Sequence, residues 1–180
     1  MKTRQDCINM IINVYLPCCG TARDCDNLCA ILDEVKNEIE SVDYCYIVLG
    51  GDTNHNMQSK DPLGNRILQS YANLGLTLCN NYLSNPNCID HTFRVESRNA
   101  YSVIDHFFVS STQPNYVNSL VTLDTAFNFS DHLPLVLNLD PNLIAVCKTK
   151  TLLQNMTNCL PDKPKLTFNW KKLINQFTTK

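Results

Sequence analysis

Apolar residues recur with two different periods at the start of the chain. From Ile8 to Val14 every second residue is apolar, with Ile11 on the other face, as in a mostly buried β-strand. Thr21 or Asp24 can then cap a helix, because apolar residues follow at helical spacing. These residues are Leu28, Ile31, Leu32, Val35 and Ile39. The pattern predicts a strand followed by an amphipathic helix that packs one face on the rest of the protein.

The middle of the chain repeats this order. Tyr44 to Leu49 is a nearly continuous apolar run, which is typical of a central strand covered on both sides, and Gly50-Gly51 are expected to end it. A second helical stretch stops at Gly75, and Leu76 to Cys79 begins another strand. The apolar positions of this helix are Ile67, Leu68, Tyr71 and Leu74.

The second half of the chain consists of short strands and turns. Tyr101 to Ser110 and Leu133 to Leu139 are predicted strands, and the periodicity fades beyond Asp140-Pro141. We therefore predict one domain over residues 1–140 and a linker with a trailing segment over residues 141–180. Strands mixed with helices predict an α/β (α+β) protein in which sheets and helices form layers.

The composition is that of a globular protein. Apolar residues make up 44% and charged residues 18% of the 180 positions, which excludes a disordered chain. No segment approaches the roughly twenty apolar residues of a membrane span, so no membrane is expected as a partner. The net charge of -2 lacks the basic excess usual in nucleic-acid binders, although a bound divalent cation can supply positive charge locally.

The chain has ten cysteines, and they bear on its compartment. They form no Cys-x-x-Cys pairs, which argues against structural zinc. Their even number and the sequons at Asn128 and Asn155 would suit a disulfide-bonded secreted protein. Cys29, Cys45 and Cys79, however, lie in apolar segments, where a free thiol behaves as a small hydrophobe. The N-terminus loosely imitates a signal peptide, but asparagines interrupt its apolar stretch. We expect free thiols and an intracellular protein, with the nucleus as a fitting compartment, rather than a secreted one.

Three acidic residues occupy similar places, at the end of an apolar strand or inside one. They are Asp52 after Gly50-Gly51, Asp105 after Ile104, and Asp131 before His132. A carboxylate among apolar residues is costly to desolvate unless a cation or hydrogen-bond donors meet it. Taken singly, Asp52 could be a strand-end turn and His132 a structural histidine. Together they predict convergence on something charged.

Five motifs in order resemble those of the endonuclease/exonuclease/phosphatase superfamily. They are Asn-Val-Tyr-Leu-Pro at 13–17, Gly-Gly-Asp-Thr-Asn at 50–54, Asp-His-Thr-Phe at 90–93, Ser-Val-Ile-Asp-His at 102–106 and Ser-Asp-His-Leu-Pro-Leu at 130–135. The Ser-x-Ile-Asp motif before an aromatic strand, and the Phe168-x-Trp170-Lys171 tail, are most similar to the endonuclease domain of non-LTR (LINE-like) retrotransposons.

The resemblance implies a four-layer α/β/β/α sandwich of the DNase I-like type. It implies phosphodiester hydrolysis with DNA as the substrate and Mg²⁺ as the cofactor, with Mn²⁺ as an alternative ion. Asp52 and Asp131 would be the metal ligands. The rest of a retrotransposon polyprotein, including its reverse transcriptase, would be a partner.

The resemblance also implies catalytic roles. Asp52 would position or activate the attacking water, Asn54 would hold the phosphate or stabilise the transition state, and Tyr15 would contact the phosphate. His132 would donate a proton to a phosphate oxygen, with Asp105 fixing its orientation, a pairing that histidine chemistry supports on its own.

The chain departs from the family pattern at its start. Family members carry, before the strand that contains Tyr15, a strand with an active-site asparagine and a Gln-Glu motif whose glutamate is the principal Mg²⁺ ligand. Only eight residues precede the matching strand here, so the resemblance implies an N-terminally truncated domain. His106 and Thr53 stand where the family often has aromatic residues.

Three functions follow as alternatives. The chain is a Mg²⁺-dependent DNA endonuclease that is active if the missing part is supplied, a catalytically dead remnant that still binds nucleic acid, or a phosphatase of the same superfamily.

Overall fold

One five-stranded sheet, with both α-helices on one side of it, forms the centre of the fold. The computed structural model describes residues 8–57, 61–82, 90–125, 128–140 and 150–152. Strand β1 (Ile8–Tyr15), helix α1 (Ala22–Glu40) and strand β2 (Tyr44–Asp52) form a parallel crossover unit. Helix α2 (Pro62–Asn73) and strand β3 (Leu76–Leu78) follow. The five-stranded sheet has the order β3-β6-β2-β1-β9, where β6 (Asp105–Ser110) is antiparallel to both of its neighbours.

Shorter elements complete the described part of the chain. Strands β4 (Phe93–Val95) and β5 (Ala100–Ser102) form a hairpin, and β7 (Val117–Thr122) pairs with β8 (Leu135–Leu139). The 3₁₀ turns are η1 (Cys79–Tyr82), η2 (Glu96–Arg98) and η3 (Pro114–Tyr116). Of the predicted linker and trailing segment, only β9 (Lys150–Leu152), parallel to β1, lies within the described residues.

Both helices begin at a side-chain cap, and the cap of α1 is one of the two predicted residues. Thr21 is the N-cap of α1, and Asp24 completes a reciprocal capping box with it. Asp61 caps α2 by accepting a hydrogen bond from the Leu63 amide. Gly75 follows α2 with a φ of +72°, a left-handed conformation that glycine adopts without strain. These local signals fix where each helix begins or ends.

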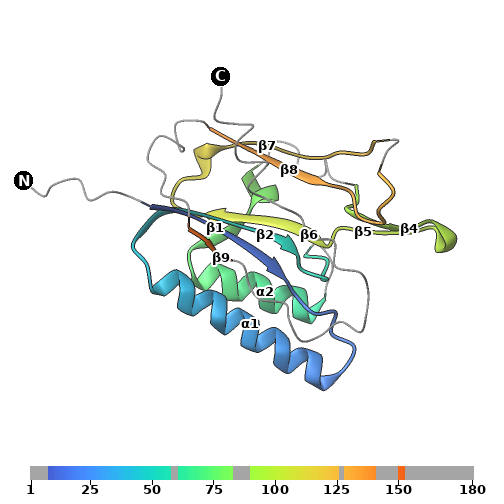
Figure 1. The fold of residues 1–180 in the computed structure, drawn as a ribbon, viewed down its shortest axis with the longest axis horizontal. Helices are drawn as coiled ribbons and strands as arrows, with labels where there is room; N and C mark the ends of the chain where they lie inside the picture. The colour runs from blue at the N-terminus through green and yellow to red at the C-terminus, as the bar shows by residue number, and fades with distance from the viewer. Residues whose placement is uncertain (1–7, 58–60, 83–89, 126–127, 141–149, 153–180) are drawn as a thin grey trace, which may run out of the picture.

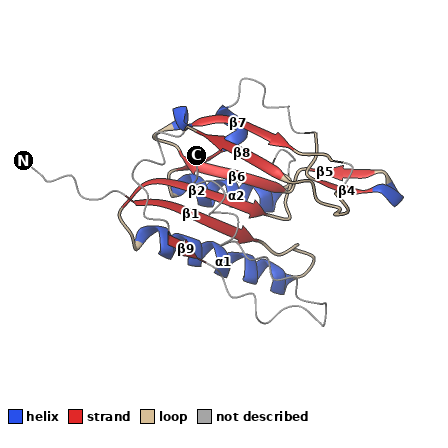
Figure 2. Ribbon diagram, turned by 45° about the horizontal axis from the view of Figure 1, so that its top comes forward, coloured by secondary structure: helices blue, strands red, loops and turns tan. Residues whose placement is uncertain are grey.

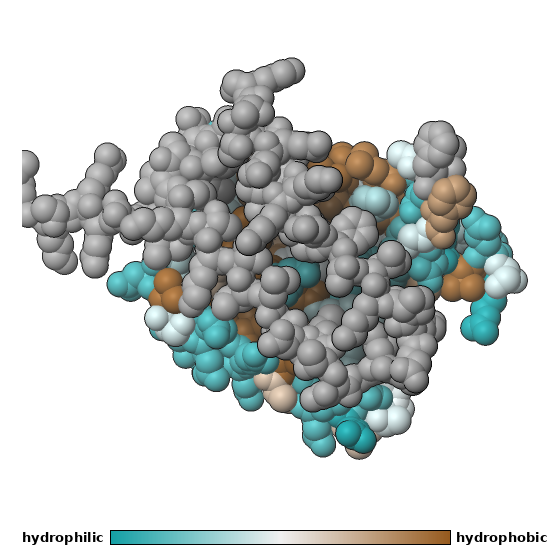
Figure 3. Space-filling view, viewed as in Figure 1, coloured by the Kyte–Doolittle hydropathy of each residue, from teal (hydrophilic) through white to brown (hydrophobic). Residues whose placement is uncertain are grey.

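The two faces of the five-stranded sheet carry different cores. The helices cover one face (Figures 1 and 2), where Met10, Ile12 and Val14 of β1 pack with the buried side of α1. The pair β7–β8 covers the other face and encloses Tyr46 and Val48. Figure 3 shows hydrophilic side chains on the α1 side and hydrophobic ones over part of the β7–β8 side. The described residues thus form an α/β/β arrangement, and neither α1 nor α2 lies on the outer side of β7–β8.

Strand β2 runs farther than its sequence suggests. The prediction that Gly50-Gly51 end it is wrong, because β2 continues through both glycines to Asp52. The ring of Phe107 packs against Gly50, where a Cβ would clash with it. At Gly51, which has a φ of +145°, a Cβ would clash with the Val14 carbonyl. The glycines permit close approach inside the sheet rather than a turn.

Two findings bear on the helices and on the cysteines. No helix in the part of the chain that the structure describes is long and apolar enough to cross a membrane. Cys29 and Cys79 are free, as expected. Cys45 is disulfide-bonded, so the expectation of a free thiol is wrong there. Cys45 is only partly buried and lies before the fully buried run of β2, which leaves its sulfur near the surface.

Candidate active site

Three strand ends meet at one end of the five-stranded sheet. Asp52 is the last residue of β2, Asp105 is the first of β6, and the antiparallel register places them directly opposite each other. Tyr15, the last residue of β1, is the partner of Asp52 on the other side. The β4–β5 hairpin lies at this same end, toward which β1 and β2 point (Figure 1). The fold therefore brings together residues that are 90 positions apart in sequence, from Tyr15 to Asp105.

His132 lies between the two carboxylates. Its Nδ1 is 3.0 Å from Oδ2 of Asp105, and its Nε2 is 3.9 Å from Oδ2 of Asp52. One ligand atom from each of the three side chains lies within 4.8 Å of the others. The ring packs edge-on against Phe93, with centroids 5.0 Å apart, and the backbones of these two residues form a bridge. The β4 strand thus holds the histidine in place.

The environment of Asp52 disfavours its ionised form. Burial is the main cause that raises the pKa of Asp52, and the nearby carboxylates of Asp105 and Asp131 raise it further. The Asn54 amide and the charge of His132 act in the opposite direction without cancelling these effects. A carboxyl group with a raised pKa is better able to accept a proton than an exposed one.

Asn54 is held in a conformation that few residues adopt. Its φ is +54°, in the left-handed region that asparagine tolerates better than most residues. Its backbone N–H donates to Oδ1 of Asp52 at 2.8 Å, and its Nδ2 donates to the Leu16 carbonyl at 2.8 Å. The side chain is therefore tied to the end of β1 beside Tyr15, whose own side chain is 51% exposed. Tyr15 is free to meet a ligand from solvent.

Asp131 lies at the rim of the site. Its side chain is exposed, and its carbonyl accepts a hydrogen bond from the Arg94 amide at 2.8 Å. It is not a member of the close group formed by Asp52, Asp105 and His132. Its carboxylate is near enough to raise the pKa of Asp52, so it contributes negative charge to the site. As a metal ligand Asp131 stays a prediction.

Thr92, in the motif Asp-His-Thr-Phe, holds the backbone at Asp105, a role that the sequence did not reveal. The fully buried Thr92 hydroxyl accepts hydrogen bonds from the amides of Ile104 and Asp105, each at 3.0 Å. The prediction of one strand from residue 101 to 110 is wrong, because the chain breaks here between β5 and β6. Thr92 pairs the amides that the break leaves without a strand partner, and so fixes where Asp105 begins β6.

Thr53 and His106, the two departures from the expected motifs, are both buried and hydrogen-bonded inside the protein. The buried Thr53 hydroxyl lies 2.8 Å from the Ile104 carbonyl, which ties the loop after β2 to the segment before β6. Nε2 of His106 is 3.1 Å from the His55 carbonyl, and burial lowers the pKa of His106 to about 4. His106 is therefore neutral, hydrogen-bonded and too buried to contact a ligand.

The donor set fits a hard divalent cation. Mg²⁺ and Mn²⁺ prefer carboxylate and water oxygens, and the site offers two facing carboxylates with Oδ2 of Asp52 pointing toward His132. Carboxylates placed opposite each other repel, and a cation between them would remove that cost. The arrangement can hold a divalent ion.

The likeness to solved structures shows a DNase I-like fold, as predicted. The sequence itself matches no known protein-family model and no curated protein. The likeness therefore rests on structure alone.

Three solved structures illustrate it. A 3′ phosphatase, NExo from Neisseria, bound to a product DNA hairpin, is 22% identical with a TM-score of 0.58, over 72% of this chain and 60% of that one. An AP endonuclease from Archaeoglobus fulgidus is 19% identical with a TM-score of 0.56, over 73% of this chain and 62% of that one. The endonuclease domain of TRAS1, a telomere-specific non-LTR retrotransposon, is 18% identical with a TM-score of 0.50, over 61% of this chain and 50% of that one. This chain therefore spans about 60% of the length of the first of these proteins.

Proposed function

We propose that this chain is a phosphodiester hydrolase that acts on DNA with the help of a divalent cation. The observation that carries the proposal is the placement of His132 between Asp52 and Asp105 at the sheet end. A histidine between two carboxylates can transfer protons and hold a phosphate oxygen at once. The structural neighbours that process DNA support DNA as the substrate.

Asp52 is the proposed base. Its raised pKa suits the removal of a proton from an attacking water, and the Asn54 amide fixes the direction of its carboxylate. Asn54 and the exposed Tyr15 flank it and are proposed to hold the phosphate. Each of these groups is anchored to a strand end rather than to a free loop.

His132 is the proposed donor to the phosphate. Asp105 accepts the hydrogen bond from Nδ1, which leaves Nε2 as the nitrogen that faces the site. When it carries a proton, Nε2 can donate a hydrogen bond or that proton to a phosphate oxygen.

Mg²⁺ or Mn²⁺ is the proposed cofactor. When bound, it would neutralise the charge that develops on the phosphate. Asp52 would hold it with Asp131, as the resemblance implies, or with Asp105, the carboxylate that lies closest. Retrotransposon-type endonuclease activity, with a reverse transcriptase in the same polyprotein, is the finer proposal. The Ser-x-Ile-Asp motif and the TRAS1 likeness support it.

Plasmid nicking tests the proposal. Supercoiled plasmid is incubated with the full chain and either cation, beside His132→Ala and Asp52→Asn, with the exposed helix variant Asp33→Asn as the matched carboxylate control. We expect nicking by the wild type and by Asp33→Asn, and its loss in the two site variants. Nicking that survives both site substitutions would refute the assignment of the site.

Each of the two alternative functions, a binding module and a phosphatase, is supported by one observation. No glutamate joins the close acidic group within the residues that the structure describes, which favours a binding module without turnover. The likeness to a 3′ phosphatase favours removal of a terminal phosphate. DNA binding without nicking would point to the first alternative, and phosphate release from a 3′-phosphorylated oligonucleotide would point to the second.

A further inference from the structure

A hollow of about 480 Å³ opens beside the candidate active site. Residues 94–96 of the β4–β5 hairpin line one side of it, and residues 128–131 line the other. Its volume falls within the roughly 300–1,000 Å³ typical of small-ligand sites. The second side ends at Asp131, the residue before His132, and the Asp131 carboxylate is near enough to raise the pKa of Asp52.

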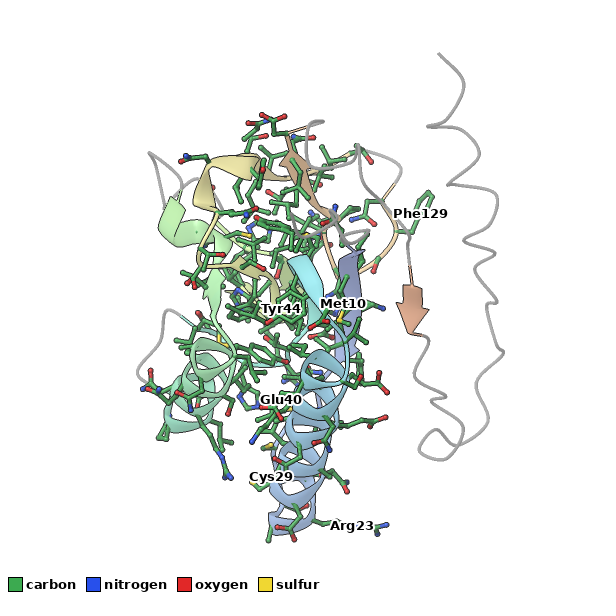
Figure 4. All side chains as sticks on the ribbon, turned by 90° about the vertical axis from the view of Figure 1, so that its left-hand side faces the viewer. Met10, Arg23, Cys29, Glu40, Tyr44 and Phe129 are labelled. Atoms are coloured by element: carbon green, nitrogen blue, oxygen red, sulfur yellow. The ribbon has the colours of Figure 1, made fainter. Side chains whose placement is uncertain are left out.

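Phe129 is the unusual residue of this hollow. Its side chain is 94% exposed, the most of any large hydrophobic side chain in the described ranges. Figure 4 shows it projecting outward from its segment. A phenylalanine ring so fully in water contributes nothing to the core, and it offers both faces to a flat ligand.

The segment that carries Phe129 is nevertheless firmly held. Nδ2 of Asn128 donates to the His132 carbonyl at 2.8 Å, and its Oδ1 accepts from the Ser130 amide at 3.1 Å. Oγ of Ser130 in turn accepts from the His132 amide at 3.1 Å. Phe129 is therefore fixed relative to His132 by hydrogen bonds on both sides of it.

The charge around the hollow disfavours a phosphate inside it. The Arg94 guanidinium is within 3.6 Å of Glu96 and 3.5 Å of Asp124, so two carboxylates already neutralise it. Asp131 adds a third negative charge. A neutral ring suits such a site, and the 78% exposed Glu96 can accept from the exocyclic amino group of a base such as cytosine.

We propose that the hollow binds one nucleobase of the substrate strand, stacked on Phe129, next to the phosphate that His132 contacts. The inference rests on the proposed function for the position of that phosphate. Stacking of a base on an aromatic side chain is among the main sources of affinity for single strands. Phe129 then positions the strand, while Asp52 and His132 act on its phosphate.

Binding of two oligonucleotides tests this inference. The first is a twelve-residue oligodeoxycytidylate, and the second has the same phosphates but abasic sugars. Affinities are measured by fluorescence anisotropy for the wild type, Phe129→Ala and the control Tyr44→Ala, which removes an exposed ring from the opposite end of β2. We expect Phe129→Ala to weaken binding of the oligodeoxycytidylate by about 5- to 150-fold. Binding of the abasic strand should not change.

A second measurement reports on the ring itself. Phe129→Trp is made together with Trp170→Phe, which removes the only native tryptophan. Oligodeoxycytidylate should quench the new tryptophan and the abasic strand should not. Equal effects of Phe129→Ala on both strands, no binding of either strand, or quenching by oligolysine in place of DNA would each overturn the inference. Base-dependent quenching without any nicking would leave it standing while the proposed function fails.

Discussion

Replacing Asp52 by asparagine is expected to stabilise the folded protein while it removes the proposed base. Asp52 faces Asp105 across an antiparallel pair, and only 16% and 20% of their side chains are exposed. Asparagine keeps an oxygen to accept the Asn54 amide, so the loop after β2 need not change. The substitution thus deletes a charge and keeps the hydrogen bond.

The expected gain in stability comes from removing the repulsion between the carboxylates of Asp52 and Asp105. Carboxylates directly opposite each other in a sheet cost up to about 1 kcal/mol, and limited exposure places this pair near that upper end. For a chain of 180 residues, about 1 kcal/mol corresponds to a rise in Tm of roughly 2–4 °C. In a protein that already carries Asp105→Asn, Asp52→Asn should stabilise the fold much less, because the repulsion between the two charges is already gone.

The pKa shift of Asp52 determines how the stability difference between the wild type and Asp52→Asn changes with pH. The pKa of Asp52 is raised from its ordinary value of 3.8, so on raising the pH the unfolded chain loses this proton before the folded one does. The free energy of unfolding of the wild type should therefore fall between the two pKa values, relative to the variant. Below pH 3.8 both forms carry a neutral side chain and should be equally stable.

Urea unfolding at pH 3 and pH 7, in the presence of a chelator, measures these differences. The control Asp33→Asn removes an exposed carboxylate from α1 and should change little at either pH. A variant Asp52→Asn that is less stable than the wild type at pH 7 would refute the reasoning. An equal gain at both pH values would do so as well, since charge would then not be its cause.

Four further outcomes follow. Added Mg²⁺ should stabilise the wild type by about 1.4 kcal/mol at ten times its Kd and leave Asp52→Asn unchanged, as thermal unfolding can show. His132→Ala should lower the nicking rate by about 10²- to 10⁴-fold, and Asp105→Asn should also lower it, in single-turnover kinetics. Thr92→Val should cost about 1–3 kcal/mol in urea unfolding, because two backbone amides lose their acceptor. Gly51→Ala should yield little folded protein, as judged by circular dichroism, because its methyl group would clash with the backbone of β1.

The helices and the central strand were predictable because their information is local. The apolar spacing of α1 and the cap at Thr21 act within a few residues, and the structure confirms both. The same rules failed at Gly50-Gly51, where a neighbouring strand rather than the local chain decides the conformation. They also failed at the break before Asp105, which depends on Thr92. Contacts between distant segments have no periodic signature in a single sequence.

The candidate site was predictable in part for a related reason. Acidic residues at strand ends mark the place where charge is costly, and the structure brings Asp52, Asp105 and His132 together there. The sequence did not show how close each carboxylate lies to His132. Which carboxylate lies closer to His132, and which remains at the rim as Asp131 does, depends on the register of β2 with β6 and on the bridge from β4.

The features that break local rules gather at this end of the sheet. Gly51 weakens a strand interior, Asn54 adopts a left-handed conformation, Asp52 and Asp105 place like charges face to face, and Phe129 leaves an aromatic ring in water. Each costs stability or gains none, whereas the caps and core of α1 obey every rule. A fold selected for stability alone would scatter such exceptions or remove them. Their concentration around His132 is what a site built for a charged ligand requires, because binding offsets the cost that folding leaves there.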